Sequence, residues 1–250
     1  MQTILLEWEG DKVTYLISDV HGCYDRYEKM LKRIKFSDDD LMYVLGDVVD
    51  YGPQPLAVLR DMSMRANVIP ILGNHEYAAY EIIRQFSEVE FTEDGIKARP
   101  GSDIDLETYT LEIQDWIDIG GGPTLNDFKK LSDEEREDYL EYLEEFSLYE
   151  VVKIKGKIYV LTHSGVPKGA TKRTLEKFDA YEYTTATTDY DPGDFENVFL
   201  ITGHYPPVNA GEEERWRIYR KGNHIALDTG AVLGETLACL CLDTDKEFYV

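Results

Sequence analysis

The chain has 250 residues, of which 43% are hydrophobic, enough to bury a sizeable core in one domain that spans residues 1–250. Its 49 acidic residues against 26 basic ones give a formal charge of −23, which argues against a nucleic-acid partner or an anionic membrane surface. No window has the roughly 20 apolar residues of a membrane span, and residues 1–7 lack the features of a signal peptide, so we expect a cytoplasmic protein.

The first half of the chain alternates predicted strands and helices. Apolar runs at residues 15–18, 41–45 and 68–72 predict three buried strands. Apolar residues at near-helical spacing in residues 30–34 and 56–62 predict a helix between each pair of strands. This order predicts a parallel sheet with right-handed crossovers, and such sheets bind ligands at the carboxyl ends of their strands.

The middle of the chain is less regular. A predicted helix over residues 80–86 precedes residues 87–105, which are acidic and lack periodicity. We expect residues 87–130 to form a partly variable connection with a partial role as a lid. Ser132 and Glu135 then have capping-box spacing ahead of another predicted helix.

The second half is mainly strands. Residues 149–154 and 157–162 are separated by Lys155-Gly156, which predicts a hairpin. Further strands are predicted at residues 198–202, 216–219, 224–228 and 237–242. We therefore expect a sandwich of mixed sheets with helices outside.

Metal-capable side chains follow several of these strands. An aspartate after a strand is more often a turn or cap residue, so Asp47 and Asp50 after residues 41–45 carry little weight alone. The same design recurs with Asp19, His21, Asn74, His75, His163 and His204. Carboxylates and imidazoles with one asparagine suit Mn²⁺, Fe or Zn²⁺, whereas Mg²⁺ and Ca²⁺ favour oxygen ligands.

This ligand set indicates a chemistry. Two metals about 3.5–4 Å apart can stabilise both the attacking and the departing oxygen of an in-line displacement at phosphorus. The sequence therefore predicts a hydrolase of phosphate esters.

Four blocks carry a family resemblance. In order and approximate spacing, they resemble the signature blocks of the PPP-type metallophosphatases, which include the bacterial serine/threonine protein phosphatases of the calcineurin-like metallophosphoesterase superfamily. The blocks are Asp19-Val20-His21-Gly22, Gly46-Asp47-Val48-Val49-Asp50, Gly73-Asn74-His75-Glu76 and His163-Ser164-Gly165. Residues 116–125 and 225–231 resemble other stretches common in the bacterial members. The resemblance implies an α/β (α+β) fold, a β-sandwich of mixed sheets flanked by helices with the metal site at the carboxyl ends of the strands.

The resemblance also implies cofactors and residue roles. The cofactors would be two divalent metal ions, with manganese expected first and iron or zinc as alternatives. The implied ligands are Asp19 and His21 for one ion, Asp47 as the bridge, and Asn74, His163 and His204 for the other. His75 would be the general acid and Asp50 its partner, with attack by metal-bound hydroxide. His224 matches no block, and we expect it to be structural.

The chain departs from the family at the phosphate-binding arginines. Tyr51 stands where the family has an arginine after Asp50, and no arginine follows Arg173 before His204. A hydrogen bond to a charged group contributes about 1.5–3 kcal/mol. Lys168, Lys172 or Arg173 could supply the charge or be ordinary surface cations, and Tyr51 could bind phosphate through its hydroxyl or select an aromatic substrate such as phosphotyrosine.

We predict a metallophosphatase that acts on phosphoproteins, at serine or threonine with tyrosine as an alternative, or on small phosphomonoesters. One alternative is a phosphodiesterase or dinucleoside-polyphosphate hydrolase on the same fold. Family members of the latter kind often carry aspartate where this chain has Glu76, which favours the phosphatase. A further alternative is a catalytically weak metal-containing binding protein, against which the intact His75 and Asp50 pair argues.

Overall fold

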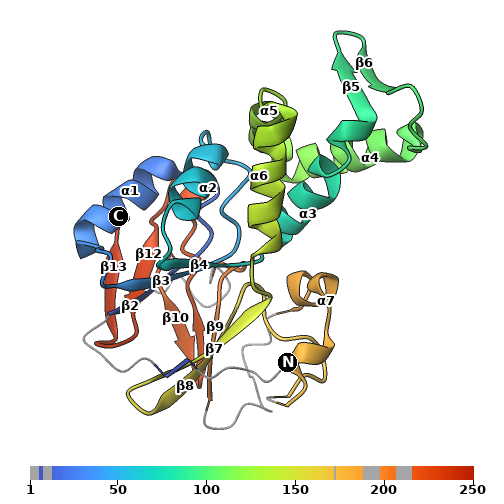
Figure 1. Ribbon diagram of the computed structural model, residues 1–250. Coiled ribbons are helices and arrows are strands. Elements are labelled where there is room, and N and C mark those ends of the chain that lie inside the picture. Colours follow the sequence, from blue (N-terminus) through green and yellow to red (C-terminus); the bar gives the residue numbers. More distant parts are fainter. Residues whose placement is uncertain (1–5, 8–12, 172, 188–197, 207–215) are drawn as a thin grey trace.

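Two β-sheets pack face to face in the computed structural model, which describes residues 6–7, 13–171, 173–187, 198–206 and 216–250 (Figure 1). The five-stranded sheet has the order β13-β12-β2-β3-β4, with β2 Thr14–Ile17, β3 Leu41–Leu45, β4 Val68–Ile71, β12 Ala238–Cys241 and β13 Lys246–Tyr249. The six-stranded sheet has the order β1-β7-β8-β9-β11-β10, with β1 Leu6–Glu7, β7 Tyr149–Ile154, β8 Lys157–Thr162, β9 Val198–Thr202, β10 Tyr219–Lys221 and β11 His224–Ala226.

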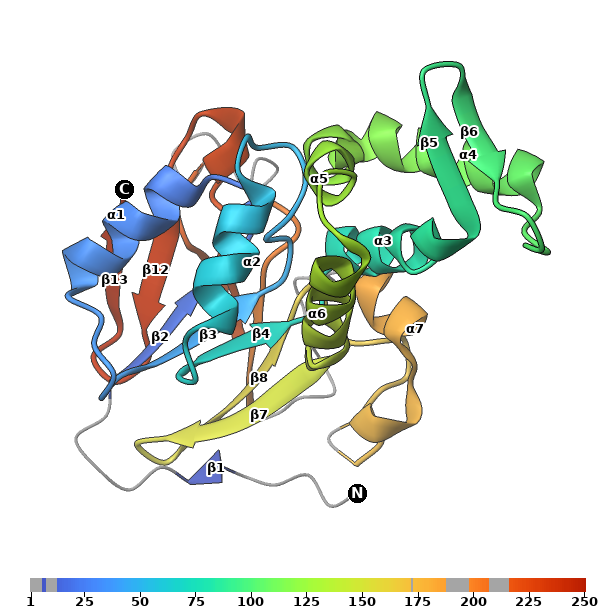
Figure 2. The same ribbon diagram turned by 45° about the horizontal axis from the view of Figure 1, so that its top comes forward.

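The predicted β-α-β-α-β unit is present. Strands β2, β3 and β4 pair in parallel, and the crossovers are α1 (Tyr24–Ile34) and α2 (Pro55–Ser63). Helix α1 is capped after Ile34 by Lys35, whose φ of 57° is left-handed. Helix α2 begins with a proline, which lacks only an N–H that the first turn cannot use. Both helices lie over the outer face of the five-stranded sheet (Figure 2).

The central strands carry mostly buried apolar side chains, so charged side chains lie at the strand ends. Side chains of a strand alternate between its two faces, so Leu16 and Tyr43 pack against Leu161 and Ile201 of the other sheet, while Ile17 packs beneath the helices. Every residue of β2, β3 and β12 is buried. Polar side chains therefore collect in the loops that follow the strands.

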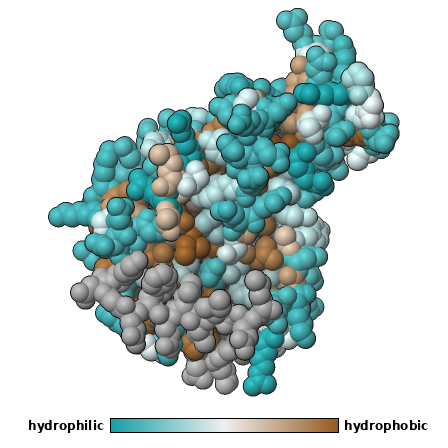
Figure 3. Space-filling model, viewed as in Figure 1, coloured by the Kyte–Doolittle hydropathy of each residue, from teal (hydrophilic) through white to brown (hydrophobic). Residues whose placement is uncertain are grey.

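Residues 86–128, here called the arm, project from the sandwich (Figures 1 and 2). The arm follows α3 (Asn74–Ile83) and contains η1 (Phe86–Glu88), β5 (Val89–Thr92), β6 (Gly95–Ala98), α4 (Leu106–Trp116), η2 (Ile117–Gly121) and α5 (Gly122–Phe128). The acidic stretch without periodicity thus includes a two-stranded hairpin, β5 with β6. Much of the arm's visible surface is hydrophilic, in keeping with the acidic composition (Figure 3).

The remaining elements follow or modify the expectations. Helix α6 (Asp133–Glu144) begins at the predicted capping box, with Ser132 Oγ accepting from the Glu135 amide at 3.2 Å. The short elements η3 (Leu175–Lys177), α7 (Ala180–Thr184) and η6 (Ala231–Leu233) complete the described part. The strand predicted to begin at Trp216 begins instead at Tyr219, because Trp216 has a left-handed φ of 65°. None of the described helices has the length and apolarity that crossing a membrane requires.

Candidate metal centre and active site

Five strand-to-loop junctions converge between the two sheets. The loops after β2, β3, β8 and β9 carry Asp19 and His21, Asp47 and Asp50, His163, and His204, respectively, and Asn74 and His75 open helix α3 just after β4. Six of these side chains are buried, and only Asn74 and His204 are partly exposed. All eight predicted metal and catalytic residues thus lie around one site, although far apart in sequence.

The loops adopt unusual backbone conformations. Left-handed φ values occur at Asp19, His21, Asp47, Asp50, Tyr51 and His204. Outside glycine such conformations cost about 1–3 kcal/mol each and persist only where the surroundings hold them. Here the loops brace one another, because the His21 amide donates to Asp47 O at 2.8 Å and the His204 amide donates to the Asp19 carboxylate at 3.0 Å.

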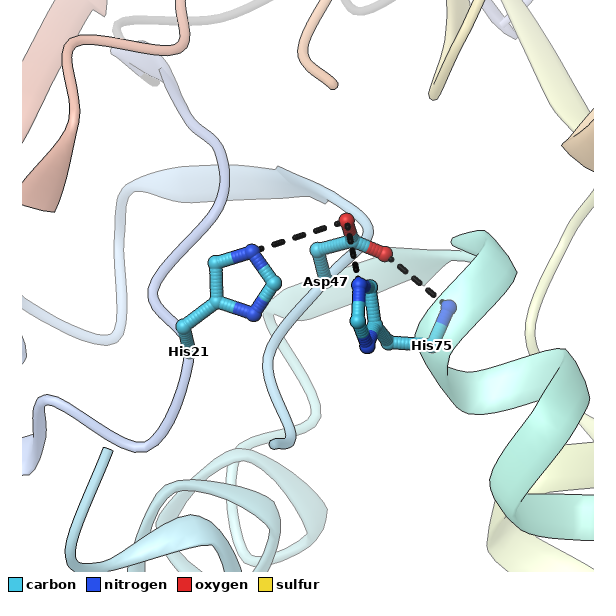
Figure 4. Close-up of side chains that lie close together, drawn as sticks. All are labelled: His21, Asp47 and His75. Atoms are coloured by element: carbon cyan, nitrogen blue, oxygen red, sulfur yellow. Dashed lines mark hydrogen bonds and ion pairs between the residues drawn. The ribbon is translucent and has the colours of Figure 1, made fainter. Parts of the chain in front are cut away.

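Asp47 is at the centre of the cluster. Its Oδ2 lies 3.6 Å from His21 Nε2, and its Oδ1 lies 3.3 Å from His163 Nε2 (Figure 4 shows the His21 side). On the second side, His163 Nε2 lies 3.0 Å from Asn74 Oδ1 and 3.1 Å from His204 Nδ1. The two carboxylate oxygens therefore face two separate groups of ligand atoms.

The imidazole tautomers favour a cation between these atoms. His21 Nδ1 lies 2.9 Å from Val49 O, and His163 Nδ1 lies 2.7 Å from Leu45 O. Because a carbonyl oxygen only accepts, both Nδ1 atoms carry a proton, and Nε2 is the atom through which each ring faces Asp47 and could bind a metal. Backbone carbonyls commonly orient metal-binding histidines in this way.

The buried carboxylates of the cluster also favour a bound cation. Burial and the neighbouring Asp228 carboxylate raise the pKa of Asp19 well above its usual value. Burial alone would lower the pKa of His163, but the carboxylates of Asp47 and Asp19 raise it to about 10. A buried positive charge is thus favourable here, and a bound divalent ion would supply it. The nitrogen and oxygen donors fit manganese, iron or zinc.

His75 lies beside this centre with its own carboxylate. Its Nδ1 donates to Asp50 Oδ2 at 2.7 Å, which leaves Nε2 facing the cluster at 4.0 Å from Asp47 Oδ2 (Figure 4). Burial opposes a charge on the ring, but the hydrogen bond to Asp50 and the charge of Asp47 raise the pKa of His75 above its ordinary value. The ring can therefore hold a proton at Nε2 near neutral pH.

Glu76 has a role that the sequence did not reveal. Its fully buried carboxylate accepts the amides of Asp47 at 2.7 Å, Val48 at 2.8 Å, Val49 at 3.1 Å and Gly73 at 3.0 Å. Burial and the charge of Asp47 raise the pKa of Glu76 to about 7. This carboxylate ties the loop after β3 to the start of α3. An acidic residue in the first turn of a helix is common, so the sequence offered no distinctive signal.

The predicted substrate-binding residues differ in their positions. Tyr51 is 50% exposed, and its ring centroid lies 5.0 Å from that of His21 and 5.2 Å from that of His75. Lys168 and Arg173 are exposed, and within the described residues no hydrogen bond or ion pair joins either side chain to the site. Lys172 lies outside the described residues.

Two more side chains approach the site, and His224 does not. Trp116 and Thr124 of the arm contact Asp50, although the sequence indicated only that their stretch resembles a family motif. His224 lies in β11, where its Nε2 is 2.9 Å from Thr202 Oγ1 inside the sandwich. Its position agrees with the structural role expected for it.

The two-sheet fold with paired ligand groups at its strand ends defines a metallophosphoesterase, a metal-dependent hydrolase. The chain belongs to the calcineurin-like phosphoesterase family, whose model matches residues 13–229. This confirms the fold class and the superfamily implied by the resemblance.

Curated relatives match parts of the chain. A symmetrical bis(5'-nucleosyl)-tetraphosphatase of Buchnera aphidicola subsp. Schizaphis graminum is 34% identical over 90 residues, which are 34% of this chain and 33% of that protein. Its counterpart in Buchnera aphidicola subsp. Baizongia pistaciae is 33% identical over 106 residues, 40% of this chain and 37% of that protein. One from Salmonella paratyphi B is 45% identical over 65 residues, 25% and 23% of the two chains. These matches thus span less than half of each relative.

Solved structures show the same fold over nearly the whole chain. A putative diadenosine tetraphosphatase is similar with a TM-score of 0.61 and 16% identity, over 96% of this chain and 93% of that one. A cold-active protein-tyrosine phosphatase of a Shewanella species has a TM-score of 0.56 and 17% identity, over 96% and 78% of the two chains. Identities this low support the fold and leave the substrate open.

Proposed function

We propose that the protein is a dinuclear metal-dependent hydrolase of dinucleoside polyphosphates. The observation that carries the proposal is the pair of ligand groups that share Asp47, with the separate His75 and Asp50 pair beside them. The substrate class is supported by the curated relatives, which are named as symmetrical bis(5'-nucleosyl)-tetraphosphatases. They favour the alternative of the sequence analysis over its first prediction, a phosphoprotein phosphatase.

Glu76 no longer argues for the phosphatase. Its carboxylate is fully buried and accepts backbone amides of Asp47, Val48, Val49 and Gly73, so loop structure accounts for its presence. A residue engaged in this way has no free oxygen to select a substrate.

The proposed roles follow the two sides of Asp47. Asp19 and His21 would hold one ion, Asp47 would bridge, and Asn74, His163 and His204 would hold the other. Bound ions would polarise the phosphoryl group and activate water. His75 would then donate the proton on Nε2 to the departing oxygen, while Asp50 holds Nδ1 and keeps the ring oriented.

A metal-depletion assay tests this function. Protein stripped with a chelator should hydrolyse nothing, and added Mn²⁺ should restore turnover of diadenosine tetraphosphate, with kcat/KM at least tenfold above that for p-nitrophenyl phosphate. Bis(p-nitrophenyl) phosphate in parallel reports general diesterase activity. Preference for the monoester would return the assignment to a phosphatase, and two bound ions without turnover would indicate a binding protein.

Tyr51 should contribute to nucleotide binding through its ring. The half-exposed ring stands beside His75, and stacking of a base on an aromatic side chain contributes about 1–3 kcal/mol by alanine substitution. Tyr51→Ala should therefore raise KM for diadenosine tetraphosphate about 5- to 150-fold, whereas Tyr51→Phe should leave it nearly unchanged. Steady-state kinetics with tripolyphosphate, which has no base, serves as the control. Equal losses in both variants would instead assign the contact to the hydroxyl.

A further inference from the structure

Asp50 receives hydrogen bonds from the arm as well as from His75. Its carboxylate is fully buried, and Oδ2 accepts both His75 Nδ1 at 2.7 Å and Trp116 Nε1 at 2.8 Å. Its Oδ1 accepts the Thr124 hydroxyl at 2.6 Å, and the Asp50 amide in turn donates to Thr124 Oγ1 at 2.9 Å. Trp116 and Thr124 lie 66 and 74 residues further along the chain, so only folding of the arm brings them here.

The turn after α4 has the shape that this contact requires. The helix gives way to a kink at Gly120, whose φ of 103° favours glycine, and Gly120 O accepts the Tyr51 amide at 2.8 Å. At Gly121 a Cβ would lie 2.5 Å from the Trp116 indole, so only glycine lets the chain pass the ring. The glycine-rich stretch thus serves as a docking turn that sets the arm against residues 50–51.

We propose that Trp116 and Thr124 are positioning residues for the general acid. A carboxylate held by His75 alone could rotate about its Cβ–Cγ bond and turn the ring with it. With the indole on Oδ2 and the hydroxyl on Oδ1, Asp50 has one orientation, and His75 Nε2 stays directed at the metal centre. Both side chains are buried, so water does not compete for these bonds. The inference rests on the proposed hydrolysis, which it deepens.

The leaving group gives a kinetic test. Trp116→Phe and Thr124→Val each remove one donor while keeping most of the side-chain volume. A phenolate leaves poorly without a proton, whereas p-nitrophenolate leaves readily. With phenyl phosphate and p-nitrophenyl phosphate as the two substrates, we expect kcat for phenyl phosphate to fall at least tenfold. We expect kcat for p-nitrophenyl phosphate to fall less than threefold, and KM for both to change less than twofold. Equal losses for both esters would reduce the two residues to a structural role.

Matched variants separate positioning from stability. Tyr109→Phe removes a buried hydrogen bond of the same helix α4, from the Tyr109 hydroxyl to Ile82 O at 2.8 Å, without touching Asp50. It should leave the ratio of the two kcat values unchanged. Thr124→Ser keeps the hydroxyl and should restore most of the activity that Thr124→Val loses.

A spectroscopic test works without turnover. In the metal-free protein the Nδ1 proton of His75 can be observed by NMR and assigned by its disappearance in His75→Asn. We expect this resonance to shift or to broaden by exchange in Trp116→Phe and Thr124→Val, and to stay in place in Tyr109→Phe. An unchanged resonance in both folded variants would overturn the proposal. Absence of turnover in the wild type would overturn the proposed function while leaving this result to decide the inference.

Discussion

Replacement of His75 by asparagine is expected to lower kcat for phenyl phosphate by about 10²–10⁴-fold, the usual contribution of general acid catalysis. The ring is the group whose Nε2 faces the metal centre while Asp50 holds its other nitrogen at 2.7 Å. The loss should be much smaller for a p-nitrophenyl ester, whose leaving group needs no proton. Steady-state kinetics with both esters measures the difference.

Metal content is the control for this variant. The proposed ligand atoms do not include the His75 ring, so elemental analysis should find as many ions in His75→Asn as in the wild type. Turnover that survives unchanged would remove His75 from the mechanism. A loss of metal together with activity would instead place His75 among the ligands, as its closeness to His21 and Asp47 also allows.

Asp47→Asn should have the largest effect on the centre, because among the described residues Asp47 is the one shared by both candidate ligand groups. We expect the loss of at least one ion and of about 10³-fold or more in activity, as several kcal/mol of metal stabilisation disappear. Ligands at 100 times their Kd stabilise a fold by about 2.7 kcal/mol, and this increment should vanish in the variant. Elemental analysis and thermal unfolding with and without Mn²⁺ measure both effects.

Without metal, the Asp47→Asn variant should also have a lower free energy of unfolding than the metal-free wild type. Although burial opposes ionisation, His163 and the other histidines hold the pKa of Asp47 below its usual value. A carboxyl group with a lowered pKa in the folded state stabilises it at pH 7, and this stability is lost as the pH falls through that pKa. We expect asparagine to lower the unfolding free energy by about 1–3 kcal/mol. Asp127→Asn, which removes only a surface pair with Lys130, should change it by less than about 0.5 kcal/mol.

Local patterns were sufficient for much of the fold. Runs such as Leu41–Leu45 are apolar throughout because both faces of the strand are buried, and this is visible without a structure. The apolar pattern did not predict where the backbone turns. At Trp216 the φ value is left-handed, and the strand begins only at Tyr219. It also showed nothing regular in residues 87–105, where β5 and β6 pair only with each other.

The sequence by itself determined which kinds of metal-binding side chain this protein places at its strand ends. Apolar strands that end in aspartates, histidines and an asparagine place candidate metal ligands at one edge of a sheet, because parallel strands end on the same side. Those short patterns repeat, and so Asp47, His75 and His163 could be found from residue types and spacing alone.

Only the tertiary structure decided how the site is held. Glu76 binds a loop that lies up to 29 residues away in sequence, and Trp116 and Thr124 reach Asp50 from the arm. Hydrogen bonds between such distant segments produce no repeating pattern in the sequence, because each donor needs only one acceptor elsewhere in the chain. The contacts that orient the proposed general acid therefore depend on how the arm packs against the loop after β3.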